Sequence, residues 1–313
     1  MLGGDYFAAP AAGQDRPVIP DAAIADLNRL QLIYETDRVF ASIGRQIVRH
    51  GDQRFIGNSG WRQDDRTFDA ARIDFDVKPG LTASYSYVWK VNQTLGTRAD
   101  SDSDSHLLHL DWVRSGAFKA SGFAYLIDLD DRPGTATFGA RATGDLPAGP
   151  AVFTYDAVLA RQQDYRTSAD FTLDHAGLEG TITYGPLAGF GGFEHWEGDG
   201  TRGFDLPFAG KHARRGWADV FSNIPAEGVE DLYLGAKANW PRPPFGRKLG
   251  FQAAFHSFDP TRGGADFGHE WNAEVSFSFA ENWSAGLQYA DYDGGAGGPA
   301  DRKKLYLSIE WQY

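Results

Sequence analysis

The sequence contains no cysteine among its 313 residues. Disulfide frameworks, thiolate nucleophiles and cysteine-ligated zinc are therefore excluded. Nor does it contain an apolar run near the roughly 18–20 residues that a membrane-spanning helix needs. Positive charge is also scarce, since 30 lysines and arginines stand against 42 acidic residues, for a net charge of −12. This balance argues against a nucleic-acid-binding protein, which would need a basic surface.

The start of the sequence lacks the features of a secretory signal peptide. Met1 to Asp5 has no basic stretch, and no apolar core follows it. The mean hydropathy of −0.42 is typical of a soluble protein. A transmembrane β-barrel has an equally weak hydropathy signal, because only every second strand residue meets lipid. A barrel is therefore compatible with the composition, and its export would require residues that precede Met1.

Aromatic residues and an alternating pattern are what the sequence has in abundance. Phenylalanine, tyrosine and tryptophan make up 14% of the chain, enough to form aromatic girdles at two membrane interfaces. In the last nine residues polar and apolar side chains alternate, and the apolar ones are Leu305, Leu307, Ile309, Trp311 and Tyr313. Successive strand residues point to opposite faces. The pattern predicts the closing strand of a membrane barrel; the alternative is an edge strand of a soluble sandwich.

About fifteen segments show this alternation, with varying clarity. They are 26–35, 39–45, 70–77, 81–91, 106–113, 118–128, 134–143, 151–162, 168–175, 178–187, 231–240, 248–256, 270–279, 283–290 and 303–313. Their connections alternate between tight turns and long loops, as do those of barrels with short periplasmic turns and long outer loops. The fold class that this predicts is all-β, an antiparallel transmembrane barrel.

We expect a single barrel domain over 1–313, with strands and loops in 26–313. Segment 1–25 is interpreted as the remnant of an outer loop. Segment 188–228 is interpreted as a long extracellular loop. Loops of this length are usually functional, as a plug, a lid or a partner surface, and we favour a lid that covers the mouth. Antiparallel bacterial barrels normally have an even number of strands. An odd count therefore predicts that the chain is N-terminally incomplete.

Basic residues occur in one predicted loop and on the predicted inner face. Segment 45–66 contains five arginines, whose guanidinium forks bind carboxylates. Such a loop would attract anions if it folded into a pore; the alternative is a solvated outer loop with internal salt bridges. Alternation also turns charges of both signs inward, namely Arg72, Lys90, Lys119, Lys237, Lys248 and Lys304 with Asp74, Asp76, Asp111, Asp156, Glu274 and Glu310.

The pattern His106-x-x-His109-x-Asp111 invites a metal-site hypothesis. Residues three apart on a strand face opposite sides, so His106 and His109 do not share a metal. His109 and Asp111 share a face, and we predict a hydrogen bond between them in the lumen. We expect no metal site and no cofactor.

Several short motifs resemble the alginate-export family of outer-membrane porins. The most specific block runs from Gly44 to Ala70 and includes Gly44-Arg45-Gln46, Asp52-Gln53-Arg54-Phe55-Ile56-Gly57-Asn58, Gly60-Trp61-Arg62-Gln63 and Thr67-Phe68-Asp69-Ala70. Supporting motifs include Asp104-Ser105-His106-Leu107-Leu108, Trp217-Ala218-Asp219 and Arg262-Gly263-Gly264-Ala265-Asp266. The likeness covers most of the chain from about residue 26 onward.

This resemblance implies a monomeric barrel of about eighteen strands in the bacterial outer membrane, in contact with its lipid and lipopolysaccharide. It implies that an anionic, alginate-like polysaccharide or oligosaccharide diffuses through a basic pore. It assigns pore roles to the motif residues Arg45, Arg54 and Arg62. A general porin for small solutes remains the alternative, because a lumen of mixed charge suits any porin. A barrel enzyme is less favoured, since no Ser–His pair is evident on one face.

Overall fold

A computed structural model of the protein describes residues 27–61, 64–94, 99–241, 243–244 and 246–311. Fifteen strands form one antiparallel sheet. They are β1 Leu30–Glu35, β2 Val39–Gln46, β3 Thr67–Lys78, β4 Leu81–Asn92, β5 Ser101–Ser115, β6 Phe118–Leu129, β7 Arg132–Ala148, β8 Ala151–Asp164, β9 Thr172–Tyr184, β10 Leu187–Trp196, β11 Val229–Trp240, β12 Lys248–Asp259, β13 Gly268–Ser278, β14 Trp283–Gly294 and β15 Arg302–Trp311. Segment 1–25, interpreted above as an outer loop, lies outside the described residues.

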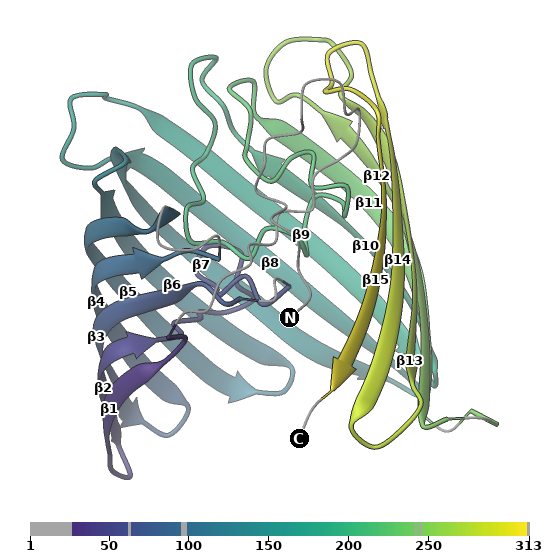
Figure 1. Ribbon diagram of the computed structural model, residues 1–313, viewed down its shortest axis with the longest axis horizontal. Coiled ribbons are helices and arrows are strands. Elements are labelled where there is room, and N and C mark those ends of the chain that lie inside the picture. The colour runs from purple at the N-terminus through teal and green to yellow at the C-terminus, as the bar shows by residue number, and fades with distance from the viewer. Residues whose placement is uncertain (1–26, 62–63, 95–98, 242, 245, 312–313) are drawn as a thin grey trace.

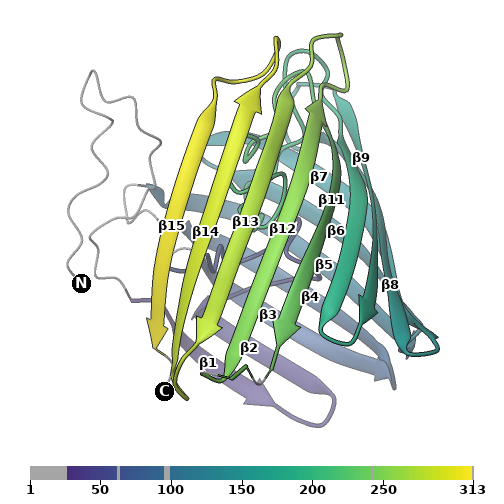
Figure 2. The same cartoon turned by 90° about the vertical axis from the view of Figure 1, so that its right-hand side faces the viewer.

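Each strand pairs with the next in the chain, and the sheet curls around a central space (Figures 1 and 2). We call this space the bore. In the part of the chain that the structure describes, β1 and β15 do not pair with each other, so the sheet is open between them. The predicted all-β, antiparallel fold is confirmed. Closure by further strands stays a prediction.

The outer face of the sheet is apolar, as the alternation predicts. On β15 Leu305, Leu307 and Ile309 are exposed, whereas the inward-facing Lys304 and Tyr306 are buried. Aromatic side chains gather where strands meet tight turns, with Trp112 against Phe118 and Trp283 against Trp311. An exposed apolar band flanked by aromatics is the surface that a bilayer covers. No described helix is long and apolar enough to cross a membrane.

The ninth and tenth strands differ from the prediction. Segments 168–175 and 178–187 were expected, but β9 is Thr172–Tyr184 and β10 is Leu187–Trp196. Gly185 has a φ of 55° in the tight turn between them, a conformation that glycine adopts at little cost. The alternation of β10 is hidden by glycines, of which Gly192 leaves room for the Tyr233 ring.

The long loop between β10 and β11 therefore begins at residue 197, not 188. It was expected to cover the mouth as a lid, yet it folds into the bore, as Figure 1 shows. Its tip contacts inward-facing side chains of distant strands. The backbone nitrogens of Trp217 and Ala218 donate to Asn272 and Glu270 on β13, and Tyr306 on β15 donates to the Trp217 carbonyl. Buried wall groups thus hold the tip of this loop inside the bore, and its role as a lid over the mouth stays a prediction.

Candidate functional site

Two loops meet inside the bore. Loop 47–66, between β2 and β3, forms two backbone hydrogen bonds with loop 197–228: Gly57 donates to Phe208 at 2.7 Å and Gly210 donates to Gln53 at 2.9 Å. Apolar side chains seal the contact, with Phe208 packed against Phe68 of β3. Burial of such rings stabilises the contact by about 1.5–3 kcal/mol for each side chain. The two loops form one packed unit against the inner wall.

A network of buried ions fastens this unit. Arg214 reaches Asp52 at 2.7 Å and Glu194 of β10 at 3.1 Å, and Arg54 lies 3.3 and 3.4 Å from the same two carboxylates. Arg141 of β7 lies 3.5 Å from Asp52. Burial by itself raises the pKa of Asp52, but Arg214, Arg54 and Arg141 outweigh it and hold the pKa below its ordinary value. The carboxylates therefore stay ionised and tie both loops to the wall.

A second anchor holds the tip of loop 197–228 to the last strand. Asp219 accepts hydrogen bonds from His212, Lys304 and Tyr306. Burial acts to raise the pKa of Asp219, but His212 and Lys304 lower it to about 2. Trp61 stacks on His212 with the ring centroids 3.9 Å apart, so the anchor also touches loop 47–66.

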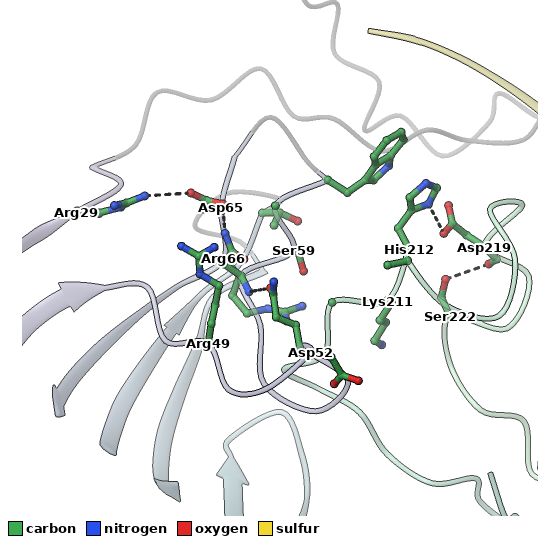
Figure 3. A pocket seen from close by; sticks show the side chains of 17 residues that line it. Arg29, Arg49, Asp52, Ser59, Asp65, Arg66, Lys211, His212, Asp219 and Ser222 are labelled. Atoms are coloured by element: carbon green, nitrogen blue, oxygen red, sulfur yellow. Dashed lines mark hydrogen bonds and ion pairs between the residues drawn. The ribbon is translucent and has the colours of Figure 1, made fainter. Parts of the chain in front are cut away.

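A cavity with a volume of about 670 Å³ lies between the two loops. Figure 3 shows it from close by, with Arg49 and Arg66 on one side and Lys211 and His212 on the other. Its polar lining includes Arg29, Arg49, Asp52, Asp65, Arg66, Lys211, His212 and Asp219. A hydrated solute of modest size fits a space with this volume and lining.

A smaller cavity of about 160 Å³ lies beside the same loop, where Glu194, Arg214, Tyr233, Lys237, Gln252 and His256 line it. Ala213 lines both cavities. Lys237 and Gln252 also line a third space of about 60 Å³ along β11, β12 and β13. Segment 211–217 thus stands between the large cavity and a polar track on the inner wall.

The arginines predicted from the resemblance are largely neutralised by carboxylates. Arg45 binds both oxygens of Asp69. Arg54 is 4% exposed and belongs to the ion network. Arg62 lies outside the described residues. The roles of all three in selectivity stay predictions.

The four strand residues predicted to face the pore are spread along the wall. Arg72 pairs with Asp74, and Lys90 lies 3.7 Å from Asp100. Lys237 lies 5.3 Å from the Phe190 ring and lines the cavities of about 160 and 60 Å³. Lys248 is exposed at the start of β12. The structure therefore does not bring these four together, and their pore roles stay predictions.

One further sequence prediction is confirmed by the structure, and one functional residue does not follow from the sequence pattern. His109 bonds Asp111 at 3.2 Å, which confirms the predicted lumen contact. No group of acidic and histidine side chains in the described residues is suited to a metal ion. The sequence pattern does not predict the anchoring role of Glu194, because the alternation predicts a loop over its segment. The feature that could have identified Glu194 is a short alternation in which Phe193 is exposed while Glu194 and Trp196 are buried.

No family model matches this chain, and neither does any curated protein. Solved structures do. The chain is similar to OccK7 (OpdD) of Pseudomonas aeruginosa, with a TM-score of 0.73 and 14% identity over 90% of this chain and 76% of the other. It is similar to the outer membrane protein OpdK of the same species, with a TM-score of 0.70 and 10% identity over 90% and 78%. It is also similar to OccAB4 of Acinetobacter baumannii, with a TM-score of 0.70 and 13% identity over 90% and 73%.

These similarities define the class: the chain has the fold of bacterial outer-membrane β-barrel porins. The apolar outer face agrees with this class. The neighbours are porins and not enzymes. They do not support membership in the alginate-export family, so that part of the resemblance goes no further than its motifs.

Proposed function

We propose that the protein is a passive, monomeric channel through which small polar solutes cross the outer membrane. The observation that carries this proposal is the polar cavity of about 670 Å³ inside a barrel wall, with a further polar track beyond segment 211–217. The porin fold of its structural neighbours supports the same function. The packed loops narrow the bore, which favours small solutes over polymers.

Passage of an anionic polysaccharide is the second candidate. The motif block from Gly44 to Ala70 favours it, as does the number of arginines in the bore. Against it, Arg45 and Arg54 already hold carboxylates of the protein, and loop 197–228 crosses the space a polymer would need. A polymer would therefore require the packed loops to move.

Planar-bilayer recordings of the full-length protein test both candidates. We expect stepwise, voltage-independent conductance above that of a detergent control, and swelling of protein-containing liposomes in small neutral and charged sugars. Block of the current by polyuronate but not by a neutral glycan of equal length would favour the polymer. An absence of both conductance and swelling would contradict the channel.

A further inference from the structure

The carboxylates of the large cavity already have cationic partners. Asp52 is held by Arg54 and Arg214, and Asp65 lies 3.8 Å from Arg29. Asp219 lies 2.8 Å from Lys304 and from His212. These acidic groups therefore contribute little free negative charge to the cavity.

Three cations of the same cavity have no such compensation. Arg49, Arg66 and Lys211 line it, and within the described ranges no carboxylate lies at ion-pair distance from any of them. The cavity is therefore electropositive despite the chain's net charge of −12. Arg49 is exposed and adds to the field that an incoming anion meets.

Arg66 is the most enclosed of the three, at 7% exposure. Its Nε donates to the side-chain oxygen of Gln93, and its Nη1 donates to the carbonyls of Gly57 and Ala209. All three acceptors are neutral, and Nη2 has no acceptor among the described residues. Neutral oxygens satisfy donors without cancelling the charge, so the guanidinium retains the capacity to bind an anion.

Lys211 lines the same cavity as Arg66 and likewise has no carboxylate partner among the described residues. Its ammonium donates to the amide oxygen of Asn223 and keeps two donors for other acceptors. Burial, and then the positive charge of Arg66, lower the pKa of Lys211 to about 8. A bound anion would reverse this penalty on the charged form.

A second cavity lined by Arg66 and Lys211, of about 530 Å³, adjoins the large cavity at these two residues. Arg66 and Lys211 line both spaces, together with Thr94. The second cavity's aspartates, Asp131 and Asp205, are engaged by Arg132 at 3.2 and 3.8 Å. The uncompensated charge thus lies where the two cavities join.

We propose that Arg66 and Lys211 form a binding station for one oxyanion group of a passing solute (a carboxylate, sulfate or phosphate). The proposal rests on the channel function proposed above and deepens it. It assigns anion recognition to this pair and not to Arg45 or Arg54, whose charges are already used. Arg66 also joins the two loops through its carbonyl contacts, so Lys211 is the cleaner residue to change.

Sulfate block of the single-channel current tests the station, because sulfate keeps one charge state across the pH range used. We expect the half-blocking sulfate concentration to rise by about tenfold in Lys211→Gln, the loss of roughly one charge-assisted hydrogen bond. Lys119→Gln is the matched control: it removes the same charge from an inward-facing position at the short-turn end of β6, away from both cavities. It should change block less than about twofold. Acetate in place of sulfate distinguishes carboxylate from tetrahedral recognition.

The pH profile gives a readout that a purely structural lysine would not move. Lys211 is faced by Arg66, Arg132 and Arg215, which lower its pKa, and by Asp205, which raises it. Because the pKa lies near 8, Lys211 is charged below that pH and neutral above it. Sulfate block should therefore weaken from pH 7 to pH 9 in the wild type, and Lys211→Gln should lack this change.

The outcomes separate the station from the channel. Conductance without sulfate block, or with equal block in wild type and Lys211→Gln, overturns the station and leaves the channel intact. If the protein does not conduct, the channel fails; the station is then judged by sulfate-dependent thermal stabilisation of the detergent-folded protein. A rise in Tm in the wild type and not in Lys211→Gln supports it, and equal rises overturn it.

Discussion

The outer wall and the loops in the bore are held by different kinds of contact. Along the wall, each strand pairs with its sequence neighbour, and lipid-facing residues such as Leu307 alternate with inward ones such as Tyr306. In the bore, Arg214 reaches Asp52 across 162 residues of sequence. A regular period therefore specifies the wall, whereas a few long-range charged and polar pairs position the bore. Substitutions in the two regions should differ in kind as well as size.

The largest effect is expected at Glu194, a carboxylate that is 3% exposed and pairs with Arg54, Arg214 and Arg215. Glu194→Gln removes the carboxylate that pairs with buried Arg215 and leaves Arg54 and Arg214 with Asp52 alone, at a cost of about 3–5 kcal/mol. Because the wall does not depend on this pair, we expect loop 197–228 to detach while the barrel stays folded. Chymotrypsin should then cleave near Phe208, and current noise should increase. Glu310→Gln, at an exposed position on β15, serves as the control; equal cleavage in both variants would contradict the anchor.

In the wall, the effect of an added charge should depend on which face of β15 carries it. Leu307→Arg places a charge on the lipid face, where the expected destabilisation is about 2–4 kcal/mol near the bilayer midplane. Ser308→Arg, one residue along and facing the bore, should cost less than about 1 kcal/mol. Folding titrations into lipid vesicles measure both. Equal losses would mean that the two faces of β15 are not a lipid face and a water face.

A smaller effect is expected where the wall holds the loop by neutral hydrogen bonds. Gln162 of β8 donates to the Asp205 carbonyl and accepts from the Asp205 nitrogen. Gln162→Leu leaves these backbone groups unpaired, at a cost of about 1–3 kcal/mol. Gln163→Leu, on the outward face next to it, should be neutral in lipid. Amide hydrogen exchange near Asp205 should increase in the first variant only, and unchanged exchange there would weaken the comparison.

The same contrast explains what could be predicted from sequence. The strand count and the lipid-facing residues follow from alternation alone, as in Leu305–Trp311. The register around β10 was lost because its glycines obscure the period. The arginine-bearing loop was recognised, but not that Arg54 would be neutralised by Glu194, which lies 140 residues further along the chain. Partners that far apart leave no local pattern.

Cross-linking of the two loops tests most directly whether they meet inside the bore. A Cβ at Gly210 would lie 3.5 Å from the Cβ of Gln53, within the range of a disulfide. Since the chain has no cysteine, Gln53→Cys combined with Gly210→Cys can form only one intramolecular bond. We predict near-complete oxidation in the folded protein, with quieter single-channel current that returns to the wild-type level on reduction. A free pair of thiols under oxidising conditions would contradict the account.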